Sequence, residues 1–155
     1  MIKTEKINLQ NDSRVIVTAG ATGIGRTIAE TLLHNGSHVC VCDISEAAVQ
    51  DFCQANPQAL GYVADVADSD QLKIFFEKAI MSMGGLDVLV NNVGIAGPTS
   101  PIENIDVSDW DKTISVNING TFYASKYAIP HLKAAGGGSI INIASSAALL
   151  GYPLR

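Results

Sequence analysis

The sequence predicts an α/β fold in which a doubly wound parallel sheet is covered by helices on both faces. Short apolar runs alternate with helical patterns from one end of the chain to the other, which is the order of strands joined by crossover helices. The apolar runs are continuous rather than alternating with polar residues, as in strands buried on both faces of a sheet. With 155 residues, the chain is expected to form a single domain.

End signals define the elements in the first half of the chain. Gly36 closes the first helix, Ser45 caps the second, and the Asn56-Pro57 pair ends it. The predicted strands cover residues 14–18, 38–42 and 60–64, and the predicted helices cover residues 25–35 and 46–55.

The second half of the chain is predicted to hold two longer helices. The later of these helices is expected to begin at a cap on Ser108, with Asp111 three residues on as in a capping box, and Pro130 should kink that helix or mark its last turns. The first runs from a cap at Asp68 or Ser69 to Gly84 and buries Leu72, Ile74, Phe75, Phe76 and Ile80. The second covers residues 109–135, and the predicted strands cover 86–90 and 139–144.

A glycine-rich turn stands between the first strand and the first helix. Residues 18–25 read Thr-Ala-Gly-Ala-Thr-Gly-Ile-Gly, and a helix that begins behind such a turn points its free N–H groups at a phosphate. Asp43 ends the second strand, where a carboxylate accepts hydrogen bonds from a ribose diol. An ordinary strand–helix connection is the alternative, but the turn and Asp43 together predict a dinucleotide site.

The same residues predict NAD as the cofactor. A 2′-phosphate would lie beside the carboxylate of Asp43, and like charges repel. Neither the glycine turn nor the residues directly after Asp43 include an arginine or lysine to offset this repulsion. The crevice of a doubly wound sheet lies at the carboxyl ends of its strands, and the residues expected there are Thr18, Asp43, Asp65, Asn91 and Ser145.

Composition excludes several other classes of protein. The formal net charge of −5 and a pI near 5.0 give no electrostatic reason to expect nucleic acid or a membrane as partner. No apolar run is long enough to span a bilayer, and the first residues lack the apolar core of an export signal, so we expect a cytoplasmic protein. Cys40, Cys42 and Cys53 are expected to be small buried residues rather than metal ligands, and we predict no metal site.

Five motifs follow one another in the order found in the short-chain dehydrogenase/reductase family. They are residues 18–25, Asp65-Val66, Asn91-Asn92-Val93-Gly94, Asn117 within 115–120, and 141–146 with its serine pair. The chain resembles this family along essentially its whole length. The resemblance implies a Rossmann-like fold and an oxidoreductase that transfers a hydride between NAD(H) and a small alcohol or carbonyl substrate.

The resemblance also implies roles for individual residues. Asn117 would support a water-linked proton relay, and Ser145 would hydrogen-bond the substrate oxygen. Alternation along a strand predicts that Ser146 points to the other side of the sheet. Ala19 replaces the first glycine of the family's turn, which should be tolerated if its φ angle is negative. The implied catalytic residues are Asn117 and Ser145, and the implied cofactor-binding residues are Ala19, Gly20, Ala21, Thr22, Gly23, Ile24, Asp43, Asp65, Val66, Asn92 and Gly94.

One departure from the family concerns its acid/base, a tyrosine in a Tyr-x-x-x-Lys motif after the serine strand. The only later tyrosine here is Tyr152, too close to Ser145 and followed by no lysine. We therefore expect residues 1–155 to be one dinucleotide-binding domain that is incomplete at its C-terminus, truncated after strand five and inactive as written. A full-length form would be a homo-oligomer, a dimer or tetramer. The alternatives are a non-catalytic dinucleotide-binding or regulatory fragment and, with less support, a methyltransferase.

Overall fold

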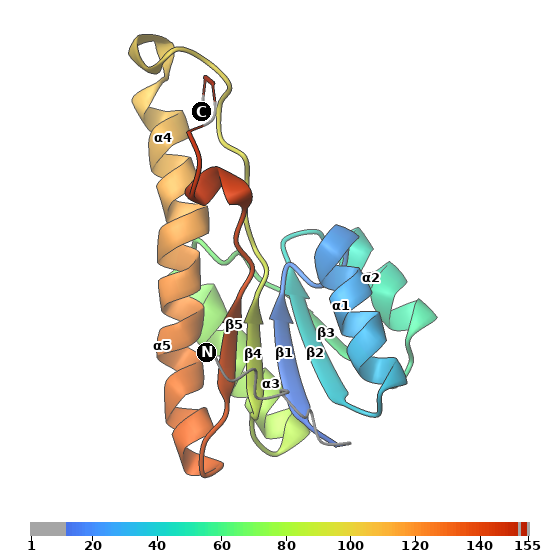
Figure 1. Ribbon diagram of the computed structural model, residues 1–155. Helices are drawn as coiled ribbons and strands as arrows, with labels where there is room; N and C mark the ends of the chain where they lie inside the picture. The colour runs from blue at the N-terminus through green and yellow to red at the C-terminus, as the bar shows by residue number, and fades with distance from the viewer. Residues whose placement is uncertain (1–11, 152, 155) are drawn as a thin grey trace, which may run out of the picture.

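The computed structural model describes residues 12–151, 153 and 154, and its centre is a parallel sheet (Figure 1). The strands are β1 (Arg14–Thr18), β2 (His38–Asp43), β3 (Leu60–Val63), β4 (Val88–Asn91) and β5 (Ser139–Asn142). Their order in the sheet is β3-β2-β1-β4-β5, and every neighbouring pair is parallel. The chain thus winds outward from β1 in one direction and then in the other, as predicted. This reversal puts the crevice between the carboxyl ends of β1 and β4.

Helices cover both faces of the sheet (Figure 1). One face carries α1 (Gly23–His34) and α2 (Glu46–Ala55), which pack on the apolar cluster that includes Val15, Val17 and Val41. The other face carries α3 (Ser69–Met83) and a long helical segment of α4 (Val107–Ile114), η2 (Ser115–Asn119) and α5 (Gly120–Ala134). Two short 3-10 helices, η1 (Ile102–Asn104) and η3 (Ser146–Ala148), lie in the connections beyond β4 and β5.

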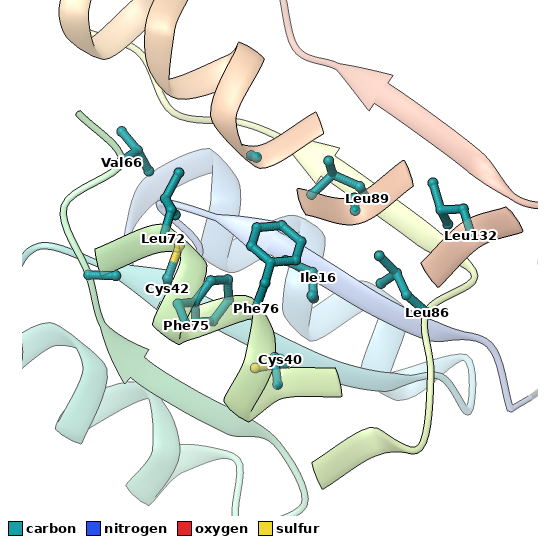
Figure 2. Packing of buried hydrophobic residues seen from close by; sticks show 14 residues of the cluster. Ile16, Cys40, Cys42, Val66, Leu72, Phe75, Phe76, Leu86, Leu89 and Leu132 are labelled. Atoms are coloured by element: carbon teal, nitrogen blue, oxygen red, sulfur yellow. The ribbon is translucent and has the colours of Figure 1, made fainter. Parts of the chain in front are cut away.

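Alternate residues of the central strands belong to the two apolar cores, one on each face of the sheet. In β1, Val15 and Val17 face α1 and α2, while Ile16 faces the cluster under α3 and α5. Figure 2 shows this second cluster, with Phe75 and Phe76 of α3 packed edge to face at a ring-centroid distance of 5.3 Å. Both phenylalanines are 2% exposed, so each contributes about 1.5–3 kcal/mol by burial.

The two cysteines of β2 are part of this cluster. Cys40 and Cys42 are fully buried, and burial raises the pKa of the Cys42 thiol to about 12 and that of Cys40 well above its usual range. Both thiols therefore stay protonated at neutral pH and act as small apolar side chains. In the part of the chain that the structure describes, no cluster of His, Cys, Asp and Glu could hold a metal ion.

Several predicted element ends are confirmed. Ser45 caps α2 by accepting a hydrogen bond from the Ala48 N–H, and Asp68 caps α3 by accepting from Asp70 and Gln71. One predicted core residue is wrong, because Ile74 is 51% exposed. The buried residues of α3 are Leu72, Phe75, Phe76 and Ala79, and position 74 lies off this i, i+3, i+4 stripe.

The long helix differs from its prediction at both its start and its middle. It begins at Val107 after Asp106, so Ser108 is a helical residue rather than the cap, and Asp111 completes no capping box. Its middle widens into the π-helix η2, which carries Asn117. Pro130 lies within the last turns of α5, as one of the two expected outcomes. No helix among the described residues is long and apolar enough to cross a membrane.

Candidate functional site

The glycine-rich turn leaves β1 through a residue in the left-handed conformation. Ala19 has a φ of 47°, so the condition of a negative φ, under which an alanine would be tolerated without strain, is not met. The conformation is held from both sides, since the Ala19 carbonyl accepts a hydrogen bond of 3.0 Å from Asn92 Nδ2 and the Gly20 N–H donates one of 3.0 Å to the Cys42 carbonyl. A left-handed alanine costs roughly 1–2 kcal/mol, and these contacts maintain it.

The glycines of the turn differ in what surrounds them. A Cβ on Gly25 would overlap the Ala19 carbonyl oxygen and the Asn92 side chain, and one on Gly20 would lie 2.7 Å from Val41. Gly23 has a φ of +53° and nothing within 4 Å of its would-be Cβ. Gly25 and Gly20 are thus needed for packing inside the turn, whereas Gly23 leaves an open surface next to the start of α1.

The start of α1 has unpaired N–H groups. Thr22 is its N-cap, and among the described residues its side chain makes no capping hydrogen bond and no acidic residue stands in the first turn. The first N–H groups of a helix have no partners within the helix. They are therefore available to an anion beside Gly23.

Asp43 is buried at the end of β2, with 8% of its surface exposed. Its carboxylate accepts hydrogen bonds from the Ala21 N–H at 3.3 Å and from the Ser45 N–H at 3.2 Å. Each oxygen of a carboxylate has two lone pairs, so these bonds orient the group without exhausting it as an acceptor. Asp43 therefore joins the glycine turn to the end of the neighbouring strand.

A cleft of about 390 Å³ opens at this edge of the sheet, and it brings together five of the predicted cofactor-binding residues. Ala19 comes from the turn, Asp43 from β2, Asp65 and Val66 from the segment after β3, and Gly94 from the segment after β4. Gly20, Ala21, Thr22, Gly23 and Ile24 continue the turn from Ala19, and Ile24 is 69% exposed beside it. Sequence reasoning missed the remaining lining residues, which are Ile44, Ala64, Ala67, Val93, Ile95, Lys112, Ser115 and Val116.

Asn92 ties the segment after β4 to the glycine turn. Besides its bond to Ala19, its Nδ2 donates to the Thr18 carbonyl at 3.2 Å, and its N–H donates to Thr18 Oγ1 at 3.1 Å. Its neighbour Asn91 is 2% exposed and donates to Ser125 and Asn142. Both asparagines therefore stabilise the packing of β4, and Asn92 shapes the turn rather than projecting into the cleft.

Asn117, in η2, hydrogen-bonds the backbone of the segment after β4. Its Oδ1 accepts a hydrogen bond of 2.8 Å from the Ile95 N–H, and its Nδ2 donates one of 2.9 Å to the Ile95 carbonyl. Its Oδ1 would also lie 3.7 Å from a Cβ on Gly94. Both polar groups of the side chain are engaged with one residue, so the amide acts on the backbone that lines the cleft.

Ser145 lies beyond the last strand rather than within it. β5 ends at Asn142, and Ser145 caps η3 by accepting a hydrogen bond of 3.2 Å from the Ala147 N–H. Its side chain is exposed, and it is not among the residues that line the cleft. Because Ser146 begins η3, the alternation of a strand does not describe its direction relative to Ser145, and that expectation is wrong. Tyr152, the tyrosine that follows Ser145 too closely for the family's motif, lies outside the described residues.

A second, larger groove of about 580 Å³ is apolar and lies around η1 and the start of α4. It is lined by Ser100, Pro101, Ile102, Ile105, Val107, Trp110 and Leu154. None of the predicted site residues is among them, so the cleft beside Asp43 is the better candidate for a ligand site.

Known proteins resemble this chain in sequence and in fold. A family model described as short chain dehydrogenase matches residues 13–155. A cyclohexanol dehydrogenase from Acinetobacter sp. (strain SE19) is 36% identical over 95% of this chain and 61% of its own length. A cis-4-hydroxycyclohexanecarboxylate dehydrogenase from Sinomonas cyclohexanicum is 36% identical over 84% of this chain and 53% of its own length.

The fold resembles that of a solved structure with a cofactor bound. The structure of ElxO with NADP bound is 32% identical and superimposes with a TM-score of 0.86 over 92% of this chain and 59% of that protein. The chain therefore spans between one half and two thirds of the length of these relatives.

Proposed function

This chain belongs to the short chain dehydrogenase family, a family of oxidoreductases, and from that membership we propose that it is the NAD(H)-binding part of a dehydrogenase. The substrate would be a small secondary alcohol or the corresponding carbonyl compound. Relatives named for cyclohexanol and for a hydroxycyclohexanecarboxylate make cyclic secondary alcohols the first compounds to test.

A dinucleotide lying across the cleft and the start of α1 would find a partner for each of its parts. The open side of Gly23 and the unpaired N–H groups of α1 suit a pyrophosphate. The Asp43 carboxylate suits a ribose diol, and Asp65 with Val66 suits the adenine. Asn92 and Gly94 belong to the backbone that would line the nicotinamide ribose. When it is bound, the nicotinamide supplies or accepts the hydride, and the protein holds the two reactants in place.

The observation that carries the choice of NAD is the position of Asp43. Its carboxylate lies in the cleft and is oriented by two backbone N–H groups, so it cannot turn away from a 2′-phosphate. Arg26, directly after the turn, is paired with Glu30 of α1 at 2.8 Å and with Asp51 of α2 at 2.5 Å, and these two carboxylates offset its charge. ElxO has NADP bound, so membership of the family does not decide the cofactor.

Two residues would act on the substrate side. The Ser145 hydroxyl would donate a hydrogen bond to the substrate oxygen, an interaction that strengthens as negative charge develops there. Asn117 would hold the Ile95 backbone, and this would fix the position of the segment after β4 relative to the nicotinamide ribose. In this proposal Asn117 is a positioning residue, because its amide contacts Ile95 rather than the reacting atoms.

A titration tests the choice of cofactor. We expect the purified chain to bind NADH at least tenfold more tightly than NADPH, as measured by the change in cofactor fluorescence. Asp43→Asn should weaken NADH binding and reduce the preference, because it removes the charge while keeping one acceptor oxygen for the backbone. Asp51→Asn is the matched control, since this carboxylate pairs with Arg26 and lies outside the cleft. Equal or tighter binding of NADPH by the unmodified chain would refute the proposal.

A further inference from the structure

The cleft beside Asp43 has a single cationic side chain among its described lining residues. Asp43 and Asp65 are the two carboxylates there, and Lys112 is the cation. Lys112 reaches the cleft from α4, more than forty residues away in sequence from Asp65, together with Ser115 and Val116 of η2. An anionic cofactor would thus enter a cleft whose own side chains carry one more negative than positive charge.

Lys112 is not committed to a structural ion pair. In the part of the chain that the structure describes, its ammonium has no carboxylate within 4.0 Å, neither Asp65 across the cleft nor Asp109 one turn earlier on α4. Arg14 pairs with Asp87 and Arg26 with Glu30 and Asp51, whereas Lys112, like the lysines of α3 and α5, is in none of the ion pairs found among the described residues. The side chain of Lys112 is exposed at the cleft wall and is available to a ligand.

We infer that Lys112 is a determinant of cofactor affinity, acting as the counter-charge for the phosphate groups of the dinucleotide. The inference rests on the proposed function. The pyrophosphate would bind at the glycine turn, of which Ala19 lines the same cleft as Lys112, and a dinucleotide brings at least two negative charges. A flexible lysine attracts them without a fixed hydrogen-bond geometry, as a mobile point charge does.

The alternative is that only the aliphatic part of Lys112 matters, packing against the adenine as a lysine stem packs on other apolar surfaces. A methionine keeps most of that stem and removes the charge, so Lys112→Met separates the two possibilities. Lys112→Arg keeps the charge. Lys133→Met is the matched control, because Lys133 stands in the last turn of α5 and does not line the cleft.

The test is the dissociation constant of NADH for these variants, measured by fluorescence at about 20 mM and about 500 mM salt. At low salt we expect Lys112→Met to weaken NADH binding roughly three- to tenfold, with Lys112→Arg and Lys133→Met close to the unmodified chain. At high salt the difference should shrink to less than about twofold, since screening removes a charge effect and leaves packing intact.

The outcomes separate this inference from the proposed function. If the unmodified chain binds NADH and Lys112→Met binds it equally well at low salt, the inference is wrong and the proposed function stands. A loss with Lys112→Met that persists at high salt also overturns it, in favour of packing by the stem. If the unmodified chain, shown to be folded by circular dichroism, binds no dinucleotide at all, the proposed function fails and the inference fails with it.

Discussion

Replacing Gly25 by alanine tests whether the glycine turn is as tightly packed as the structure indicates. The new methyl group would overlap the Ala19 carbonyl oxygen and the Asn92 side chain. Moving Asn92 away would break its hydrogen bonds to Ala19 and Thr18, at 3.0 and 3.2 Å. Overpacking costs about 1–3 kcal/mol, and each lost hydrogen bond costs about 0.5–1.5 kcal/mol. We therefore expect Gly25→Ala to lower the free energy of unfolding by about 2–6 kcal/mol.

Gly23→Ala is the comparison that makes this prediction specific. Gly23 has open space around it, so an added methyl group meets no neighbour. Its φ of +53° is the only source of strain, and a left-handed alanine costs roughly 1–2 kcal/mol. The two variants add the same methyl group to the same turn. The difference between their free energies of unfolding therefore measures how tightly Gly25 is packed.

Urea unfolding followed by circular dichroism measures both variants, and NADH fluorescence measures binding where the variant is folded. We expect the larger loss of stability for Gly25→Ala and a measurable loss of NADH affinity for both. Gly23→Ala should affect binding mainly through its new methyl group on the open side of the turn. A Gly25→Ala variant that is no less stable than Gly23→Ala would refute the packing argument.

Three further predictions concern other parts of the chain. Ala19→Gly should leave the chain between unchanged and about 1 kcal/mol more stable in urea, because relief of left-handed strain is partly offset by the greater freedom of glycine in the unfolded chain; a loss of more than about 1 kcal/mol would contradict the strain. In a longer protein that includes this chain and has the proposed activity, Ser145→Ala should lower kcat by about 10²–10³ while changing the NADH dissociation constant little, and Ser146→Ala should be milder because only Ser145 is proposed to contact the substrate oxygen; the reverse order would show that the two roles are misassigned. The Arg14 guanidinium lowers the pKa of Asp87 below its ordinary value of 3.8, so the stability this pair adds is present at neutral pH and is lost as pH falls through the lowered pKa. Asp87→Asn should therefore be less stable than the unmodified chain at pH 7 and indistinguishable from it in acid, as thermal unfolding at each pH would measure.

Much of the fold could be predicted from the sequence because it depends on local patterns. The predicted bounds of β1 agree with the observed ones, and the caps at Ser45 and Asp68 follow from side chains that hydrogen-bond the N–H groups just ahead of them. The parallel, doubly wound sheet follows from the alternation of apolar runs and helices together with the handedness of crossovers. One of the errors is local as well. Hydrophobicity assigns Ile74 to the core, although its position on α3 faces away from the buried stripe.

The candidate site was predictable only in part. Asp43, Asp65 and Gly94 each end a strand or follow one, and strand ends meet at one edge of a parallel sheet whatever the intervening sequence. No short-range pattern marks Lys112 as part of that edge, because its place in the cleft depends on where α4 packs after the connection from β4. The π-helix around Asn117 also depends on a contact between distant residues, because it lies where the helix meets the segment after β4 and Asn117 binds Ile95.

Ala19 shows most clearly how contacts in the folded chain can override a local preference of the sequence. From the sequence, an alanine in place of a glycine favours a negative φ, since its Cβ makes the left-handed region costly. In the folded chain that local preference, worth roughly 1–2 kcal/mol, is outweighed by the bonds from Asn92 and from Gly20 to Cys42. Periodicity and end signals in the sequence predict most of the strands and helices and the doubly wound class of the sheet. The shape of the turn and the charge of the cleft arise from contacts between residues far apart in the chain, so they follow only from the folded structure.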